Sequence, residues 1–488
     1  MTSQQLADAV QSQLPYSPNT QQEALIGALA RFCEGLSGEV DDRQPTQQSQ
    51  PTQDRVFVLN GYAGTGKTSL VSALVRALKQ FKVNVVLMAP TGRAAKVFAH
   101  YSGFAAATIH RRIYRHSLRG EIPGLKENRD NNTLYIVDEA SMIGSGSDAY
   151  SGDLLTDLFT YVFAGINNRL IFMGDTAQLP PVGDSDSPAM DAFALKERGF
   201  KISAATLTRV VRQGARSGIM ANAVNIRRMM YEKPDKIPVP LTEGFDDVST
   251  ITAVDMAEAI DHAYRTAGID DTIIITRSNR RAADFNKAIR AEVLYIDEEL
   301  AQGEPLLVVK NNYYWTRVAK RRDIDFLANG DIMRVTKVIG TELKYGFWFA
   351  DVEFVPVEND MDADSGETVE TPPIQAKIFL ETLIGEHPAL PYERQKLLFD
   401  RIVQREYPGH PNPMQALADN PYWNALQTKF AYCVTCHKAQ GGQWSRVFVD
   451  VAYINPDAVG PELYRWMYTA TTRARHHLTY LVDTSHDS

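Results

Sequence analysis

A glycine-rich octapeptide between an apolar run and a helical pattern constrains the fold of this chain more than any other feature. Residues 61–68 read Gly-Tyr-Ala-Gly-Thr-Gly-Lys-Thr, which has the spacing G-x-x-x-x-G-K-[ST]. Its glycines let successive backbone N–H groups curl around a phosphate, and the N-terminus of a helix expected over 69–79 adds partial positive charge. The alternative to a phosphate-binding loop is a glycine-rich turn that binds no ligand. The pattern predicts a nucleotide site at Gly61, Ala63, Gly64, Thr65, Gly66, Lys67 and Thr68, with the Thr68 hydroxyl available to Mg²⁺.

The carboxylates that such a site needs stand at the end of another apolar run. Residues 134–137 are Leu-Tyr-Ile-Val, and Asp138 and Glu139 follow directly. We expect Asp138 to hold Mg²⁺ and Glu139 to orient and deprotonate the attacking water. Alone, this pattern could be a strand that ends in a charged turn, but together with the glycine-rich loop it predicts hydrolysis of a nucleoside triphosphate. ATP is expected rather than GTP because no guanine-reading Asn/Thr-Lys-x-Asp sequence follows.

Short apolar runs alternate with helical patterns, which is typical of a parallel sheet covered by helices on both faces. One such sheet is expected from the runs 56–59, 83–88, 134–137 and 170–173. Two further runs, 272–276 and 447–451, lie far downstream and predict a second α/β domain.

The segments outside these runs differ in composition and in hydrophobic pattern. Residues 16–36 predict an amphipathic helix, and the Gln-, Pro- and Thr-rich stretch 41–54 predicts a surface loop. Mixed β-type pieces at 331–335 and 347–352, an acidic stretch at 358–370 and a helical pattern at 393–405 predict an insertion in the second domain.

Composition excludes several classes of protein. Among 488 residues the formal net charge is −8, which excludes a uniformly basic nucleic-acid coat but allows a local basic groove. Three cysteines are too few for a disulfide scaffold. The first residues lack a basic and an apolar region of a secretory signal, and no apolar run reaches 18 residues, so a cytoplasmic protein is expected.

Residues 433–437 match the C-x-x-C-H pattern of haem attachment, but the rest of the sequence does not support a haem or a metal there. Haem attachment requires export, and a zinc site requires about four ligands, while the sequence has no second Cys pair or His cluster. We therefore expect neither haem nor a structural metal at this motif.

Six further blocks follow the glycine-rich loop in order, at residues 89–96, 108–110, 174–183, 207–213, 435–442 and 468–474. With these blocks, residues 16–305 and 426–482 resemble superfamily 1 helicases, and within them the RecD/Dda-like 1B branch. The phosphate loop begins within about 60 residues of the start, so the resemblance is to the compact Dda-like form rather than to a nuclease-complex subunit.

The resemblance implies an α/β fold with two RecA-like parallel-sheet domains, a short β-hairpin pin at about 114–132 and an SH3-like insertion. The first domain is expected over 1–204 and the second over 205–305 and 426–488. The insertion is expected over 306–425, with a loose match at Asn329-Gly330-Asp331. The pin region has no aromatic residue between His116 and Asn132, so strand separation by an aromatic wedge is not expected.

The resemblance also implies roles for individual residues. Gln178, with Asp175, would contact Mg²⁺ or the γ-phosphate, and Arg212 and Arg473 would stabilise charge on the transferred phosphoryl group. Gln21 would read adenine, with Gln22 as a close competitor, and Gly441 would join the ATP site. The expected contacts to DNA phosphates are Thr91, Arg93, Thr108, His110, Thr435 and His437, although each of these alone could be a helix cap or turn residue.

The function implied is that of an ATP- and Mg²⁺-dependent DNA helicase, which moves 5′→3′ on single-stranded DNA and unwinds tailed duplexes, as a free-standing monomer. Two alternatives stay open at this point. One is a nucleic-acid-dependent ATPase that remodels protein–DNA or RNA complexes without processive unwinding, and the other is an RNA helicase. The sequence identifies no protein partner and no pathway.

Overall fold

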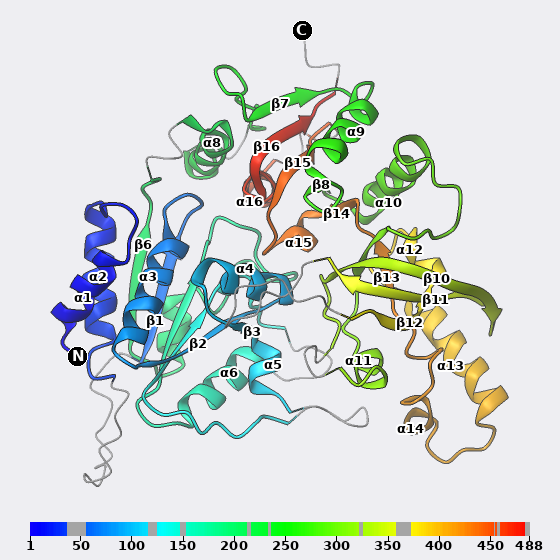
Figure 1. Cartoon of the computed structure of the whole chain (residues 1–488), viewed down its shortest axis with the longest axis horizontal. Coiled ribbons are helices and arrows are strands. Elements are labelled where there is room, and N and C mark those ends of the chain that lie inside the picture. The colour runs from blue at the N-terminus through cyan, green and yellow to red at the C-terminus, as the bar shows by residue number, and fades with distance from the viewer. Residues whose placement is uncertain are drawn as a thin grey trace. The chain divides into compact units, whose positions relative to one another are not determined.

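The computed structural model describes residues 1–36, 55–115, 124–146, 153–211, 216–232, 236–321, 326–357, 372–452, 454–455 and 459–483. These residues form two compact units, the first ending at Arg216 and the second beginning at Ser217 (Figure 1). The expected domain boundary at 204 falls inside a strand, Ile202–Leu207, of the first unit. The expected loop at 41–54 and the acidic stretch at 358–370 both lie outside the described residues.

The first unit is built on a six-stranded parallel sheet in the order β3-β2-β4-β5-β1-β6. Its strands are β1 (Val56–Gly61), β2 (Asn84–Ala89), β3 (Ala106–Thr108), β4 (Thr133–Val137), β5 (Arg169–Gly174) and β6 (Ile202–Leu207). Its helices are α1 (Ser3–Ser12), α2 (Thr20–Phe32), α3 (Lys67–Gln80), α4 (Gly92–Ser102), α5 (Ile109–Ile113), a 3-10 turn (Ala140–Met142), α6 (Leu154–Phe163) and α7 (Ala192–Glu197).

Alternate side chains of the central strands enter two different cores. Phe57, Ile136 and Ile171 pack with α1, α2 and α3 on one face of the sheet. Val58 and Phe172 belong to the core that also contains residues of α5 and α6, on the other face. The apolar runs are continuous because both faces are covered, which confirms the expectation for this sheet.

The predicted pin coincides in part with an antiparallel stem. Tyr114 and Leu125 form an isolated antiparallel bridge, and the Arg115 N–H donates to the Gly124 carbonyl at 2.8 Å. The expected tip, Ile122–Leu125, is described only from Gly124 onward. The pin therefore stays a prediction at its tip.

The second unit contains a five-stranded parallel sheet in the order β14-β8-β15-β16-β7 and a five-stranded antiparallel sheet in the order β12-β11-β10-β9-β13. The parallel strands are β7 (Val248–Ile251), β8 (Thr272–Thr276), β14 (Cys433–Thr435), β15 (Trp444–Asp450) and β16 (Ala474–Leu481). The antiparallel strands are β9 (Pro305–Val308), β10 (Ile332–Lys344), β11 (Phe347–Pro356), β12 (Ile374–Phe379) and β13 (Thr428–Phe430). A second parallel-sheet domain was expected and is confirmed.

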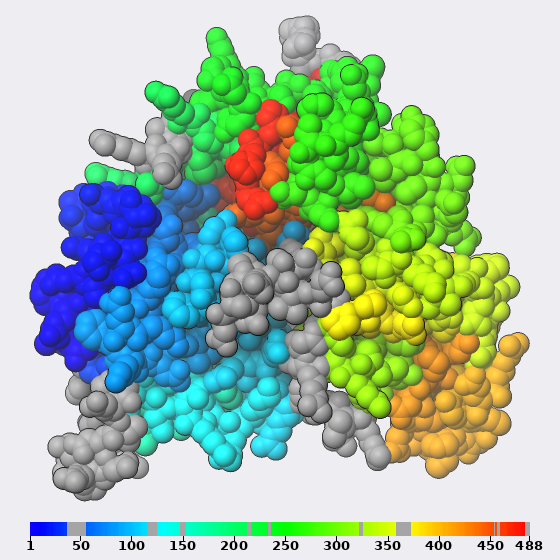
Figure 2. Space-filling view, in the orientation of Figure 1, coloured from blue at the N-terminus to red at the C-terminus, as the bar shows by residue number. Residues whose placement is uncertain are grey.

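Helices cover both sheets of the second unit. They are α8 (Gly218–Glu232), α9 (Met256–Ala267), α10 (Asn279–Ala288), a π-helical turn (Ile289–Val293), α11 (Tyr314–Val318), α12 (Leu380–Leu383), α13 (Tyr392–Glu406), α14 (Pro413–Leu417), α15 (Cys436–Ala439) and α16 (Pro461–Thr471). Phe347 and Phe349 of β11 share a core with Leu398 and Ile402 of α13. Figure 2 shows α13 and α14, in orange, beside the yellow-green strands of this sheet.

The expected insertion is thus an antiparallel sheet with its own helical cover, while its SH3-like character stays a prediction. No helix in the described part of the chain is long and apolar enough to span a bilayer.

Candidate functional site

The glycine-rich loop lies between β1 and α3, as the sequence predicts. Gly64 and Gly66 have φ angles of 72° and 78°, in the left-handed region that favours glycine. A Cβ atom on Gly66 would lie 2.8 Å from Gln22 Nε2 and 2.9 Å from the Tyr16 hydroxyl, so the site has no room for a larger residue. Gly66 caps α3 without a side-chain hydrogen bond, which leaves the first N–H groups of α3 available to an anion.

The two neighbouring glutamines at the start of α2 make different contacts. The Gln22 side chain is buried, and its Nε2 donates to the Thr65 carbonyl at 3.1 Å, while its Oε1 accepts from the Asn19 N–H. Gln21 instead contacts the end of β6, where its Oε1 accepts from the N–H groups of Thr208 and Arg209, both at 3.1 Å. The fold therefore brings Gln22, the competitor residue, to the phosphate loop. Adenine recognition by Gln21 stays a prediction.

The two carboxylates follow β4 in the predicted order. Asp138 is buried, and burial raises its pKa to about 7, with the charge of Lys67 opposing that effect and the charge of Glu139 adding to it. The Glu139 N–H donates to Asp138 Oδ1 at 2.7 Å. Glu139 has a φ angle of 51°, so its backbone adopts a left-handed conformation that is uncommon for a residue with a side chain.

Buried polar atoms without partners gather where β4 and β5 end. Among the described residues, Glu139 Oε2, Ser141 Oγ and Gln178 Oε1 are buried and make no hydrogen bond. Since an unsatisfied buried polar group costs about 1–3 kcal/mol, three of them near one edge of the sheet point to a ligand. β1 and β4 both neighbour β5, so the loops that follow these three strands meet at the carboxyl edge, where α/β sheets bind ligands.

These residues fit a magnesium nucleotide. The loop offers N–H groups and the Lys67 ammonium to phosphates, while the Asp138 carboxylate and the Thr68 hydroxyl are oxygen ligands of the kind that Mg²⁺ prefers. Ser141 was not predicted from the sequence, although its place two residues after Glu139 was a usable signal.

The expected DNA contacts of the first unit include two helix caps. Thr91 Oγ1 accepts from the Ala94 N–H at 3.2 Å and caps α4, whose first turn carries Arg93. Thr108 Oγ1 accepts from the Arg111 N–H at 3.1 Å and caps α5. His110 lies in the first turn of α5, with its ring centroid 5.5 Å from that of Tyr114. Both threonines therefore serve as helix caps, which is the structural alternative that the sequence left open. An additional contact to a DNA phosphate stays a prediction.

In the second unit, Arg473 is buried and held by its own domain. Its Nε donates to the Thr469 carbonyl at 3.0 Å, and Nη1 donates to the Gly442 carbonyl at 3.2 Å. Gly441, the preceding residue, has a φ angle of 73°. Arg212, the other expected arginine, lies outside the described residues.

Thr435 and His437 flank the start of α15. Thr435 ends β14 and is mostly buried, and burial lowers the pKa of His437. Cys433 and Cys436, in the same segment, are buried free thiols whose pKa is raised by burial. Across the part of the chain that the structure describes, no three His, Cys, Asp or Glu side chains are grouped as metal ligands.

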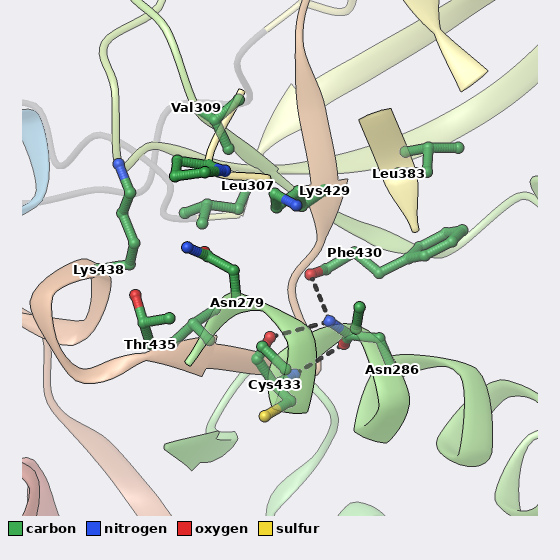
Figure 3. A pocket seen from close by; sticks show the side chains of 14 residues that line it. Asn279, Asn286, Leu307, Val309, Leu383, Lys429, Phe430, Cys433, Thr435 and Lys438 are labelled. Atoms are coloured by element: carbon green, nitrogen blue, oxygen red, sulfur yellow. Dashed lines mark hydrogen bonds between the residues drawn. The ribbon is translucent and has the colours of Figure 1, made fainter. Parts of the chain in front are cut away.

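A hollow beside Thr435 was not anticipated by sequence reasoning. It is lined by residues of α10, β9, β13 and β14 and by both Lys429 and Lys438, and it is small and partly open to solvent (Figure 3). Lys438 lies inside the block 435–442, whereas no motif marks Lys429, and the fold brings the two side chains to the same hollow.

Comparisons with known proteins agree with this geometry. An AAA domain family matches residues 41–234, and the UvrD-like helicase C-terminal domain family matches residues 430–481. An ATP-dependent RecD2 DNA helicase from Deinococcus radiodurans is 33% identical over 39% of this chain and 23% of its own length. The ATP-dependent DNA helicase dda of Enterobacteria phage T4 is 24% identical over 62% of this chain and 66% of its own length.

A solved structure of Pif1 helicase from Bacteroides, in complex with ADP-AlF3 and single-stranded DNA, aligns over 88% of each chain at 16% identity with a TM-score of 0.41. The chain spans about a quarter of the length of the Deinococcus relative. The two family matches and the named relatives confirm the resemblance that the sequence motifs carry.

Proposed function

We propose that this chain, which has the two matched domains of a superfamily 1B, RecD/Dda-like helicase, hydrolyses ATP to move 5′→3′ along single-stranded DNA and to unwind duplex DNA. One observation carries the proposal. The phosphate loop and the buried, unpartnered side-chain oxygens of Glu139, Ser141 and Gln178 lie at the same edge of the sheet. Polar oxygens without partners beside the phosphate loop are suited to a bound metal–nucleotide and an attacking water.

The residues divide the chemistry between them. The loop N–H groups and Lys67 bind the β- and γ-phosphates. Gln22 holds the loop in place by donating a hydrogen bond to the Thr65 carbonyl. Glu139 accepts a proton from the attacking water, and Gln178 orients that water or senses the γ-phosphate. Arg473 and Arg212 stabilise charge on the transferred phosphoryl group.

Mg²⁺ fits the same residues. Asp138 and Thr68 would hold it, and the ion would neutralise charge that develops between the β- and γ-phosphates. Because burial raises the pKa of Asp138 to about 7, the carboxyl must lose its proton before it can serve as a ligand. Protons should therefore compete with Mg²⁺ for this carboxyl as the pH falls.

Support for DNA as the substrate comes from the relatives, whose names describe DNA helicases. The direction of movement rests on the family resemblance alone. Thr91, Arg93, Thr108, His110, Thr435 and His437 are the proposed contacts to the strand. Affinity should fall with salt by about 0.7 in log–log slope for each phosphate neutralised on a single strand.

An unwinding assay tests the proposal. Duplexes with a 5′ tail or a 3′ tail, in DNA and RNA forms, are mixed with the protein, ATP and Mg²⁺. We expect strand separation of the 5′-tailed DNA and no activity for Lys67→Ala, which should still bind single strands because Lys67 serves the triphosphate. Unwinding of only the 3′-tailed duplex would overturn the direction. DNA-stimulated hydrolysis without any strand separation would favour a remodelling ATPase instead.

A further inference from the structure

Residues 207–211, which include the end of β6, run along the phosphate loop and are hydrogen-bonded to it at both ends. The Tyr62 N–H donates to the Leu207 carbonyl at 3.3 Å, and the Val211 N–H donates to the Gly64 carbonyl at 2.8 Å. The 207–211 segment is therefore joined to the nucleotide site through the backbone alone, which does not depend on the side chains of the segment.

The Gln21 side chain holds the middle of the 207–211 segment. Its Oε1 accepts from the N–H groups of Thr208 and Arg209, both at 3.1 Å, and its Nε2 donates to Thr208 Oγ1 at 2.9 Å. Thr208 and Arg209 are exposed, so burial of apolar surface contributes little to fixing them. Gln21 reaches them from α2, which lies beside β6 (Figure 1). One amide is thus the main anchor of this part of the segment.

The start of α2 is itself held in place. Asn19 Oδ1 caps the helix by accepting from the N–H groups of Gln21 at 3.0 Å and Gln22 at 3.1 Å. The Gln22 Oε1 in turn accepts from the Asn19 N–H, which completes a capping box. The Gln21 amide therefore extends from a backbone whose position is already fixed.

The contact between Val211 and Gly64 sets the direction of peptide groups in the phosphate loop. In a trans peptide the C=O and the N–H that follows it point in opposite directions, and no cis peptide bond occurs among the described residues. The Gly64 carbonyl points toward Val211, so the Thr65 N–H points away from it. Gln22 holds the Thr65 carbonyl in the same manner, which directs the Gly66 N–H to the opposite side. Two consecutive peptide planes are fixed before a ligand binds, so less ordering is needed on binding.

We propose that Gln21 is a positioning residue for the triphosphate, which acts through the 207–211 segment on the Gly64 carbonyl, and that it does not read the base. The inference rests on the proposed function, since it concerns the binding of the same nucleotide. It differs from the adenine-reading role that the family resemblance implies for Gln21.

The hydrogen-bonding capacity of the Gln21 amide supports this role. A carbonyl oxygen has two lone pairs, and those of Gln21 Oε1 are used by the N–H groups of Thr208 and Arg209. An amide that recognises adenine with both its groups needs this oxygen to accept from the exocyclic amino group. Reading of the base in that way would break the anchor that holds the 207–211 segment.

Inorganic tripolyphosphate distinguishes the two roles, because it has the phosphates of ATP but no base. Its binding, and that of the non-hydrolysable analogue AMPPNP, are measured with Mg²⁺ by displacement of a fluorescent ADP. Gln21→Ala should weaken both ligands by the same factor of about ten, since two hydrogen bonds to the segment are lost. The ratio of kcat/KM for ATP to that for CTP should stay unchanged, because the base is not involved.

Two further variants complete this measurement. Gln21→Glu keeps an acceptor for the two N–H groups, so it should recover most of the tripolyphosphate affinity at about 0.3 M salt, which screens the added charge. An adenine-reading amide would not be replaced in this way, because a carboxylate has no donor. Gln11→Ala is the matched control, since it removes an exposed glutamine of α1. Thermal midpoints from circular dichroism check that each variant is folded.

A double-mutant cycle tests the route through the segment. Val211→Pro removes the N–H that donates to the Gly64 carbonyl. If Gln21 acts through this contact, adding Gln21→Ala to Val211→Pro should weaken tripolyphosphate by less than about twofold. A merely structural role of Gln21 would give additive losses. The Gln21 single variants decide the proposal if the proline variant does not fold.

Three results would overturn the inference, each for a different reason. Weaker AMPPNP with unchanged tripolyphosphate would assign Gln21 to the base. Unchanged binding of both ligands to Gln21→Ala would make its contacts to Thr208 and Arg209 incidental. Additive losses in the cycle, or a glutamate variant as weak as the alanine variant, would exclude the route through the segment. Wild-type protein that neither binds nor hydrolyses ATP would instead refute the proposed function itself.

Discussion

Replacing Asp138 with asparagine should make the nucleotide-free protein more stable at neutral and alkaline pH. Asparagine has nearly the same shape as aspartate but carries no charge. In the folded chain the Asp138 carboxyl is buried at the end of β4, and burial is the main cause of its raised pKa of about 7. The chain therefore carries a destabilising charge at this position whenever the pH exceeds that value and no cation is bound.

The magnitude follows from the two titrations. In the unfolded chain the carboxyl has a pKa of about 3.8, so between about pH 4 and pH 7 the folded form keeps a proton that the unfolded form has released. Stability accordingly falls as pH rises through this window and stays constant above it. A shift of about three units corresponds to at most about 4 kcal/mol. Asp138→Asn should gain up to that amount relative to wild type at pH 8, a smaller amount at pH 5, and show little difference at or below about pH 3.8.

Urea unfolding followed by circular dichroism, without nucleotide or divalent metal, measures the difference at several pH values. Asp8→Asn is the control, because Asp8 lies exposed on α1. A variant that is less stable than wild type at pH 8 would refute the reasoning. It would mean that the attraction between Lys67 and an ionised Asp138 exceeds the cost of burying the carboxylate.

Three further changes have expected outcomes. Gly66→Ala should abolish binding of fluorescent ADP, since its φ angle of 78° and the 2.8 Å approach of a Cβ to Gln22 Nε2 would distort the loop; normal ADP binding would contradict the geometry. Gln22→Glu should raise the KM for ATP about tenfold by losing the donor to the Thr65 carbonyl, and an unchanged KM would make that contact incidental. Arg473→Ala should lower DNA-stimulated kcat at least about a hundredfold with a smaller loss of DNA binding, and lysine should restore little. A drop of less than about fivefold would reduce Arg473 to its structural bonds with Thr469 and Gly442.

The sequence predicted the buried parts of the fold better than its edges. The central strands β4 and β8 were clear because every residue of each is buried, which produces an uninterrupted apolar run. The strands β6, β7 and β16 were missed. β6 and β7 are edge strands, and β16 begins with charged and exposed residues, so their patterns do not stand out from loops.

The candidate site shows the same division. The phosphate loop and its carboxylates were predicted because each is a local pattern. The contact between Gln22 and Thr65 was not predicted, since it joins residues 43 positions apart, and the contact between Gln21 and Thr208 joins residues 187 apart. The topology of the chain brings such residues together, and no local spacing pattern in the sequence predicts these contacts.

The way the antiparallel insertion joins its host has a consequence for how such a chain could be rebuilt. The first strand of the insertion, β9, and its last, β13, are neighbours in register, with Val308 opposite Thr428. Opposed residues in an antiparallel pair lie about 5 Å apart, so a turn of a few residues could bridge them. Because Val352 and Phe354 of β11 share a core with Ile274 of β8, the intervening stretch could be exchanged for another sheet that fills this core, whereas its simple excision would expose apolar side chains of the host.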